Sequence, residues 1–331
     1  MLEEVERWLA SRSWSAADRP LDQLAAAKRA RGSRVSVVLP ALDEEATVGE
    51  IVEVVRRELM DPVSGTPLVD ELVVVDSGST DRTAEVAAKA GARVVHRDEI
   101  LPRIPALPGK GEVLWRSLLV TSGDIVCFVD ADLRDFDAAF VSGIVGPLLT
   151  DPEVQFVKAM YDRPLVGADG VPDAGPGGGA GQGGRVTELV ARPLLNLHWP
   201  RLAGFVQPLG GEYAVRRSLL ERLPFPVGYG VELGLLVDAL HTVGLDALAQ
   251  VDVGVRIHRH QDGLALGRMA AAIYRTAQLR LSRGHLVRPE LTQFVRGEGG
   301  FEPRTYAVDT EERPPMREIE EYTRLSGREA G

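Results

Sequence analysis

The sequence predicts an α/β protein with a mostly parallel sheet flanked by helices. In the first half of the chain, short runs of β-branched residues alternate with stretches of helical periodicity, which is the pattern of βαβ units. The run at residues 125–129 is apolar throughout, as a strand covered on both faces should be. Polar residues follow several of these runs, and ligands of open α/β sheets bind at the carboxyl ends of strands.

Taken in order, strands are predicted at residues 35–39, 72–75, 92–95 and 125–129. Helices are predicted at 47–59, 84–90, 186–197 and 269–281, with Ser79 or Thr80 capping the second of them. Residues 167–184 hold nine glycines and predict a mobile loop. A late strand is expected where Val251, Val253, Val255 and Ile257 alternate inward, which places Arg256, His258 and His260 together on its other face.

Composition and charge exclude several classes of function. The 331 residues carry a net charge of -10, which speaks against a nucleic-acid partner but leaves small phosphorylated ligands open. The single cysteine, Cys127, lies in an apolar strand and predicts an inert buried thiol. No apolar run approaches the roughly 18 residues of a membrane helix, and the amino terminus is acidic. We therefore expect a cytoplasmic protein with no membrane span.

The sharpest local feature is Asp130-Ala131-Asp132, directly after the apolar strand at 125–129. Two carboxylates separated by one small residue can hold a hard divalent cation that also bridges a diphosphate. A turn capped by the two aspartates is the alternative. His258 can complete the metal shell as a neutral imidazole, although a lone histidine is more often structural.

Three cationic or polar residues suit phosphate groups. Lys110 lies between two glycines and is a flexible charge suited to a diphosphate, with a solvated lysine in a turn as the alternative. Arg185 and Thr187 follow the glycine-rich stretch and can receive a phosphate. Their alternative roles are an exposed arginine and a threonine that caps a helix.

Three motifs occur in sequence order, each at the end of a predicted strand: Leu39-Pro40-Ala41-Leu42-Asp43-Glu44-Glu45, Val75-Asp76-Ser77-Gly78-Ser79-Thr80-Asp81 and Asp130-Ala131-Asp132. This series resembles the donor-binding half of the GT-A glycosyltransferases, so a Rossmann-like GT-A fold is expected. The resemblance implies that Asp76 accepts hydrogen bonds from the base or ribose of a nucleotide sugar. The residues it assigns to the nucleotide sugar are Pro40, Ala41, Leu42, Glu44, Asp76, Ser77, Lys110, Asp130 and Ala131.

Further motifs narrow the resemblance: Pro108-Gly109-Lys110-Gly111-Glu112, Gly183-Gly184-Arg185-Val186-Thr187, Gln207-Pro208-Leu209-Gly210-Gly211, Gly228-Tyr229-Gly230-Val231-Glu232 and Arg256-Ile257-His258-Arg259. With them, residues 34–281 resemble the glucosyl-3-phosphoglycerate synthase family, which is close to the mannosyl-3-phosphoglycerate synthases. The resemblance implies a retaining, metal-dependent transfer of glucose from a nucleoside diphosphate glucose to the 2-hydroxyl of 3-phosphoglycerate. UDP-glucose is the leading candidate for the donor.

The same resemblance assigns the remaining site residues. Glu232, Asp132 and Leu209 belong to the catalytic set, and Mg²⁺ or Mn²⁺ is held by Asp132 and His258. The acceptor contacts Gly184, Arg185, Thr187, Tyr229 and His260. A homodimer is expected. Asp43, His260 and Gly210 depart from the family pattern, which has Asn, Asn and Ser at these positions.

The expected organisation has four parts. Residues 1–32 form an N-terminal helical segment, 33–216 the nucleotide-sugar-binding region and 217–302 a helical acceptor-binding region. Residues 303–331 form a tail, interpreted as a poorly ordered extension or a partner-binding arm.

Three alternative functions stay open on the sequence alone. The first is a mannosyl-3-phosphoglycerate synthase that uses GDP-mannose. The second is a polyprenyl-phosphate sugar transferase, which shares the donor half but works at a membrane. The third is a catalytically inactive sugar-nucleotide sensor.

Overall fold

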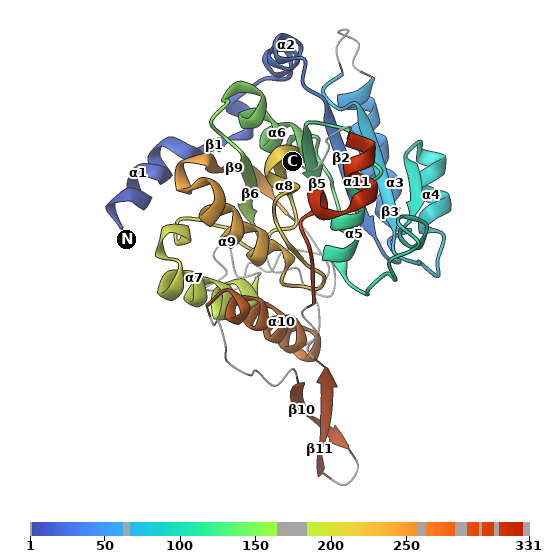
Figure 1. Ribbon diagram of the computed structural model, residues 1–331, viewed down its shortest axis with the longest axis vertical. Coiled ribbons are helices and arrows are strands. Elements are labelled where there is room, and N and C mark those ends of the chain that lie inside the picture. The colour runs from blue at the N-terminus through green and yellow to red at the C-terminus, as the bar shows by residue number, and fades with distance from the viewer. Residues whose placement is uncertain are drawn as a thin grey trace.

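The computed structural model describes residues 2–61, 67–163, 184–256, 263–281, 290–297, 300–307 and 311–326. An eight-stranded sheet runs through its centre in the order β1-β9-β6-β7-β5-β2-β3-β4 (Figure 1). Its strands are β1 (Ser13–Ser15), β2 (Val35–Ala41), β3 (Glu71–Asp76), β4 (Arg93–His96), β5 (Ile125–Phe128), β6 (Phe156–Asp162), β7 (Tyr213–Arg216) and β9 (Leu248–Val255).

The mostly parallel sheet predicted from the sequence is confirmed. β4, β3, β2 and β5 are parallel neighbours, as are β1, β9 and β6. β7 is the exception, because it pairs antiparallel with both β5 and β6 and so joins the two parallel groups. The carboxyl ends of β2, β3 and β5 therefore meet at one edge, where the three donor motifs begin.

Both faces of the sheet are covered, so alternate residues of one strand enter two separate cores. On β2, Val38 belongs to one core, while Val37 and Leu39 belong to the other. The first core includes residues of α1 (Glu3–Arg12), α5 (Lys110–Ser117), α7 (Arg192–His198), α8 (Arg217–Leu220), α9 (Val231–Val243) and α10 (Gly263–Leu281). The second includes residues of α2 (Leu21–Arg31), α3 (Val48–Val55), α4 (Thr83–Ala90) and α6 (Ala139–Thr150). Two-sided burial is the reason for the continuous apolar runs in the sequence.

The predicted helices exist, with different ends. The helix expected at 47–59 is α3 followed by a π-helical turn, Arg56–Met60, and a second π turn, Thr187–Ala191, leads into α7. The predicted cap of α4 is wrong. Ser79 instead hydrogen-bonds Asp76, and the Asp81 carboxylate accepts the Thr83 amide at 2.9 Å.

The predicted alternation on β9 fails at its carboxyl end. The pairing of β9 with β6 shifts register between Met160 and Asp162, and Gly254 there has a φ of +93°. Such a bulge reverses which side chains face inward. Val255, predicted to face inward, is 53% exposed, whereas Arg256 is 4% exposed.

The C-terminal segment is not the poorly ordered extension predicted for residues 303–331, at least over 311–326. β12 (Glu312–Arg313) pairs with β8 (Phe225–Pro226), and the first core contains Met316 and Tyr322, the second of which lies on α11 (Glu320–Ser326). The predicted boundary at residue 303 falls inside β11 (Gly300–Ala307), which pairs with β10 (Glu290–Gly297) in a hairpin that extends away from the body (Figure 1). The division into functional regions stays a prediction.

Arg313 fastens this segment to α5. Its guanidinium pairs with the fully buried Glu112 carboxylate at 2.7 Å, and its Cζ lies 5.3 Å from the centre of the Trp115 ring. The Trp115 indole donates a hydrogen bond to the Pro314 carbonyl at 2.9 Å. These contacts hold the helix that begins at Lys110.

Arg313→Ala is expected to lower the free energy of unfolding by about 1–3 kcal/mol, because it removes charged hydrogen bonds from a buried carboxylate. Urea unfolding followed by circular dichroism measures the change. Arg324→Ala is the matched control, since its ion pair with Glu320 is exposed and should contribute little. Equal effects of the two substitutions would contradict the assigned role of Arg313.

Candidate active site

One cavity of about 930 Å³ lies at the carboxyl ends of the central strands. It brings together residues predicted for the donor, the metal, the acceptor and catalysis: Pro40, Ala41, Leu42, Glu44, Ser77, Lys110, Asp130, Ala131, Asp132, Gly184, Arg185, Thr187, Leu209, Tyr229 and Glu232. Asp76 is not among the lining residues. His258 and His260 lie outside the described residues, so their predicted roles stay predictions.

Asp76 organises the loop that presents Ser77. It is 2% exposed, and its carboxylate accepts hydrogen bonds from the Gly78 amide at 3.1 Å and from the Ser79 hydroxyl at 2.5 Å. Nδ1 of His96 lies 3.2 Å from the same carboxylate. This arrangement makes Asp76 a structural anchor of the loop that follows β3.

Asp43 ties the first donor loop to the second. Its carboxylate accepts the Thr80 amide at 2.7 Å, and its own amide donates to the Ser79 hydroxyl at 3.0 Å. Its φ of +55° is left-handed, a conformation that Asn and Asp adopt more readily than most residues. Both requirements are met by Asp or by Asn, so this departure from the family pattern leaves the loop geometry intact.

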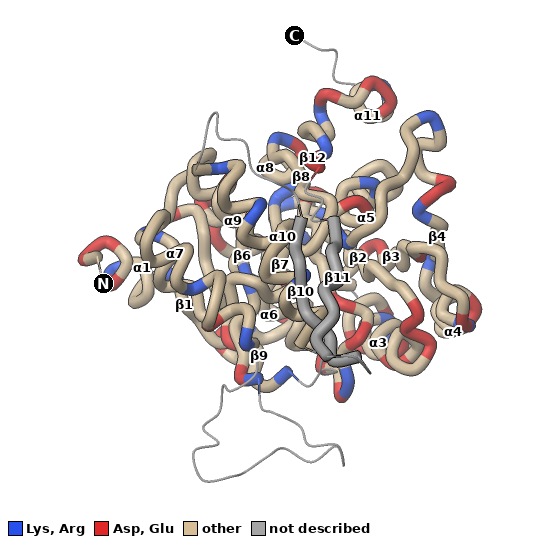
Figure 2. Tube along the Cα trace, turned by 90° about the horizontal axis from the view of Figure 1, so that it is seen from below, with Lys and Arg blue, Asp and Glu red and all other residues tan. Residues whose placement is uncertain are grey.

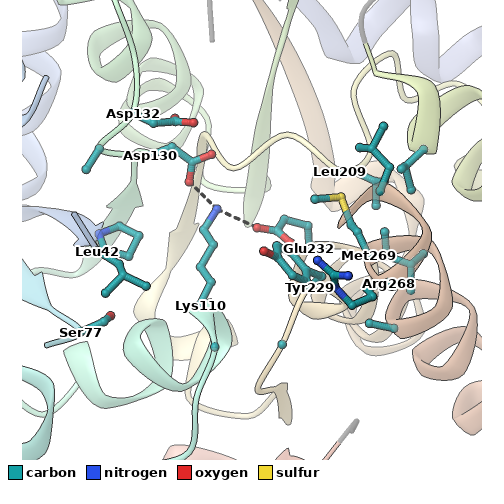
Figure 3. Close-up of a pocket in the computed structure, with 18 of the residues that line it drawn as sticks. Leu42, Ser77, Lys110, Asp130, Asp132, Leu209, Tyr229, Glu232, Arg268 and Met269 are labelled. Atoms are coloured by element: carbon teal, nitrogen blue, oxygen red, sulfur yellow. Dashed lines mark hydrogen bonds and ion pairs between the residues drawn. The ribbon is translucent and has the colours of Figure 1, made fainter. Parts of the chain in front are cut away.

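Lys110 is held rigidly, not solvated in a turn. Its ammonium bridges Asp130 and Glu232, at 2.8 Å from Glu232 Oε1 (Figure 3). The flanking glycines allow the backbone at Lys110 to lie close to residues 226–227. A Cβ on Gly111 would lie 1.8 Å from the Pro226 carbonyl oxygen, and one on Gly109 would lie 2.3 Å from the Val227 carbonyl oxygen. Burial acts to lower the pKa of Lys110, but the two carboxylates outweigh it and raise the pKa well above its ordinary value.

Arg256 is the second cation of the site. Its Nη2 lies 2.8 Å from Asp130 Oδ2 and 3.2 Å from Asp132 Oδ1, and its Nε lies 3.1 Å from Glu212 Oε1. Burial acts to raise the pKa of Asp130, yet Lys110 and Arg256 together hold it at about 2. Asp130 is therefore ionised throughout the neutral range.

Asp130 and Asp132 fit a divalent cation. A positive group, the Arg256 guanidinium, already bridges the two carboxylates, and their side chains keep 22% and 33% of their surface exposed. Burial raises the pKa of Asp132, and Arg256 offsets only part of that rise. The described residues contain no group of three His, Cys, Asp or Glu side chains that could hold a metal, so a third ligand has to come from outside them.

The cavity is locally basic in an acidic protein. Among the described residues that line it, six are Lys or Arg and four are Asp or Glu, while the whole chain carries a net charge of -10. Figure 2 shows acidic residues on the outside, at α1, α4 and α11. Such a distribution attracts an anionic ligand into the cavity.

Arg185 and Thr187 line the cavity at the start of the segment that leads into α7. Arg185 is exposed, whereas Thr187 is 3% exposed at the start of the π turn that leads into α7. Gly184, with a φ of +88°, turns the chain into this segment. The helix α10, which contacts this π turn, also lines the cavity, with Leu266, Arg268, Met269, Ala272 and Ile273.

Lys158 lies beneath the cavity floor and was not part of the predicted site. It is 1% exposed and donates a hydrogen bond to the Gly210 carbonyl at 2.7 Å, next to Leu209. Burial lowers its pKa to about 8, and the carboxylates of Glu232 and Glu212 oppose the fall. The lysine supports the Leu209–Gly210 backbone at the cost of a buried charge.

Several arginines of the cavity are not predicted by the sequence. Arg256 was placed on a polar face, but the bulge that turns it toward Asp130 follows from strand pairing. Arg163 and Arg97 belong to none of the sequence motifs that indicate a ligand site. Arg268 lay one residue before the predicted start of a helix that in fact begins at Gly263.

An anionic nucleotide sugar suits this cavity, and the fold is that of the GT-A glycosyltransferases. The family model described as "Glycosyl transferase family 2" matches residues 36–168. A curated glucosyl-3-phosphoglycerate synthase of Mycolicibacterium paratuberculosis is 50% identical over 95% of this chain and 92% of its own length. The chain belongs to the glucosyl-3-phosphoglycerate synthase family.

Solved structures agree with this assignment. The Mycobacterium tuberculosis glucosyl-3-phosphoglycerate synthase, in complex with Mn²⁺, UDP and phosphoglyceric acid, matches with a TM-score of 0.78 and 46% identity, over 90% of this chain and 95% of its own. Mannosyl-3-phosphoglycerate synthase from Rubrobacter xylanophilus matches with a TM-score of 0.84 and 40% identity, over 95% and 97%. The GT-A fold expected from the motifs is thereby confirmed.

Lys158→Met tests the buried charge. A lysine with a pKa of 10.5 when unfolded and about 8 when folded costs stability below pH 8, and the cost disappears as the pH rises toward 10.5. The free energy of unfolding of the unsubstituted protein should therefore rise relative to Lys158→Met between pH 8 and pH 10. Urea midpoints of both proteins at each pH measure the difference, and a constant difference would contradict the lowered pKa.

Proposed function

We propose that this chain transfers glucose from UDP-glucose to the 2-hydroxyl of 3-phosphoglycerate, with retention of the α configuration, and so makes glucosyl-3-phosphoglycerate. The observation that carries the proposal is the shared cavity: the described residues assigned to donor, metal and acceptor line it together, apart from Asp76. Relatives with 50% and 46% identity are synthases of this product.

The donor end is suited to hold a diphosphate. Lys110 pairs with one oxygen of Asp130 and Arg256 with the other, and both cations line the cavity in which a diphosphate would lie. Positive groups fixed before the reaction stabilise the charge that develops on a leaving diphosphate. A Mg²⁺ or Mn²⁺ ion would add to that stabilisation, and its proposed ligands are Asp132 and His258.

The acceptor end orients the attacking hydroxyl. Arg185 and Thr187 are suited to the phosphate of 3-phosphoglycerate, because a guanidinium and a hydroxyl both donate to phosphate oxygens. The acceptor oxygen bonds to the anomeric carbon as the bond to the diphosphate breaks, and the hydroxyl proton passes to the leaving group. Glu232 is 7% exposed and paired with Lys110, so its proposed part is to orient the sugar beside that lysine.

A mannosyl-3-phosphoglycerate synthase activity with GDP-mannose is the second candidate. The Rubrobacter xylanophilus structure, which carries that name, gives the higher TM-score of the two, 0.84 against 0.78. The acceptor is the same in both candidates, so the difference lies in the base and in one sugar epimer.

Cytoplasmic residence and a homodimer are part of the proposal. None of the helices in the described part of the chain combines the length and the apolar character that crossing a bilayer requires. A polyprenyl-phosphate acceptor would instead call for work at a membrane surface.

Asp132→Ala and His258→Ala should each lower turnover by about 100-fold or more, because each removes a predicted ligand of the ion that opposes charge on the leaving group. Coupled detection of UDP release, with and without chelator, measures turnover, and calorimetry measures Mn²⁺ binding. Asp135→Asn, in the same loop but outside the cavity lining, is the control and should keep full activity. Full activity in either alanine variant would remove the metal assignment.

Competition among UDP-glucose, GDP-glucose and GDP-mannose decides between the two candidates. We expect kcat/KM with 3-phosphoglycerate to be about 10-fold or more higher for UDP-glucose, because hydrogen-bonded sites reject a donor whose groups do not match. Mass spectrometry of the phosphorylated product, with all three donors present, reports the choice. Faster transfer from GDP-mannose would establish the second candidate.

A further inference from the structure

α10 contributes a charged side chain to the cavity that neither the donor nor the proposed phosphate site uses. Its lining residues are Leu266, Arg268, Met269, Ala272 and Ile273, and of these only Arg268 is charged. Arg268 is half-buried. A half-buried arginine on a ligand cavity points to recognition of an anionic group.

The position of α10 is fixed by its packing. The helix contacts α9, α7 and the π turn that begins at Thr187. A Cβ on Gly230 would lie 1.9 Å from the Thr276 hydroxyl oxygen, so the turn that carries Tyr229 lies directly against α10. At its far end, Arg280 Nε pairs with Asp238 of α9 at 3.0 Å. The helix that carries Arg268 is therefore anchored to both elements that form the acceptor end.

In the view of Figure 3, Arg268, Met269 and Leu209 appear on the same side of Lys110 as Tyr229 and Glu232, and all of them line the cavity. In this view Leu42 and Ser77, which belong to the donor loops, lie on the other side of Lys110. Arg268 thus occupies the acceptor end of the cavity. The apolar neighbours lower the local dielectric and strengthen a contact between opposite charges.

The chemistry of the acceptor calls for two cationic sites. A 3-phosphoglycerate molecule has a carboxylate at one end, a phosphate at the other and the attacking hydroxyl between them. If both ends are held, the hydroxyl is fixed between two anchors, and such fixing is a large part of catalysis by orientation. Arg185 and Thr187 suit the phosphate, and a planar guanidinium matches a carboxylate with two parallel hydrogen bonds.

We propose that Arg268 binds the carboxylate of the acceptor and thereby selects phosphoglycerate over phosphorylated alcohols that lack a carboxylate. The inference rests on the proposed function, because it names which residue of that same site holds which end of the acceptor. It adds one residue of α10 to the acceptor contacts expected from the sequence.

Three acceptors separate the two ends of the ligand: 3-phosphoglycerate, D-glycerate, which lacks the phosphate, and glycerol 3-phosphate, which lacks the carboxylate. Binding of each to the full chain with Mg²⁺ and UDP is measured by calorimetry, and kcat/KM is measured with UDP-glucose. Arg268→Ala should weaken the binding of 3-phosphoglycerate and of D-glycerate about 10- to 100-fold, which is the effect of losing a charged hydrogen-bonded contact. Its effect on glycerol 3-phosphate should be less than about twofold, which is below the effect of one net hydrogen bond.

Two controls accompany the variant. Arg268→Lys keeps the positive charge but loses the planar guanidinium that donates two parallel hydrogen bonds. It should therefore bind 3-phosphoglycerate more tightly than Arg268→Ala and less tightly than the unsubstituted protein. Arg201→Ala removes an arginine that pairs with Glu4 and does not line the cavity, so all three acceptors should bind as before. Circular dichroism shows whether each variant is folded; if Arg268→Ala is not, Arg268→Gln replaces it.

The outcomes separate the two levels of the proposal. If the unsubstituted protein neither binds nor glucosylates 3-phosphoglycerate, the proposed function itself fails, and the role of Arg268 fails with it. In the other case, the unsubstituted protein is active while Arg268→Ala weakens the binding of glycerol 3-phosphate as much as that of 3-phosphoglycerate, or weakens the binding of no acceptor. Either result overturns only the carboxylate assignment.

Discussion

The site depends on one partly buried carboxylate, Asp130, which pairs with two cations from distant parts of the chain. Lys110 reaches it from the start of α5, and Arg256 reaches it from the bulged end of β9. Asp130 itself follows β5 in the middle of the sheet. Removing either cation would leave Asp130 with one positive partner instead of two and the cluster with an uncompensated negative charge, a destabilising change. The same three charges that hold these elements together also define the floor of the cavity, so stability and ligand binding are coupled at this point.

Close backbone approach makes that ionic cluster possible. A Cβ on Gly211 would lie 2.2 Å from Asp130 Oδ2, and the glycines around Lys110 let α5 lie against the strand β8. Arg256 depends in turn on Glu212, which also accepts a hydrogen bond from the Tyr161 hydroxyl at 2.8 Å. Arg256 is thus positioned by two buried partners, Tyr161 on β6 and Glu212 directly before β7, and β6 and β7 lie between β9 and β5 in the sheet.

The sequence predicted the strands with the strongest apolar character and missed those whose place depends on pairing. The runs now seen as β2, β3, β4 and β5 are each recognisable alone, whereas β1 has only three residues. The three donor motifs converge as predicted, because parallel strands end at one edge. The roles of Asp43 and Arg256 could not be predicted, since the first depends on a contact between two loops and the second on a bulge produced by the neighbouring strand. The prediction of a poorly ordered tail was wrong because it was based on the charged and proline-rich composition of the segment. That composition gives no sign that Met316 and Tyr322 are buried in the core.

The attachment of residues 311–326 to α5 has a consequence for biosynthesis. On the ribosome, α5 emerges about 200 residues before its partner Arg313, since the two ends of the Arg313–Glu112 contact are 201 positions apart. Until translation reaches the end of the chain, Glu112 has Arg116 as an ionic partner but lacks the clamp from the C-terminal strand. The lysine at the start of that helix is therefore fully braced only in the finished polypeptide, so a chain released early by premature termination would carry the donor half of the enzyme without its complete support.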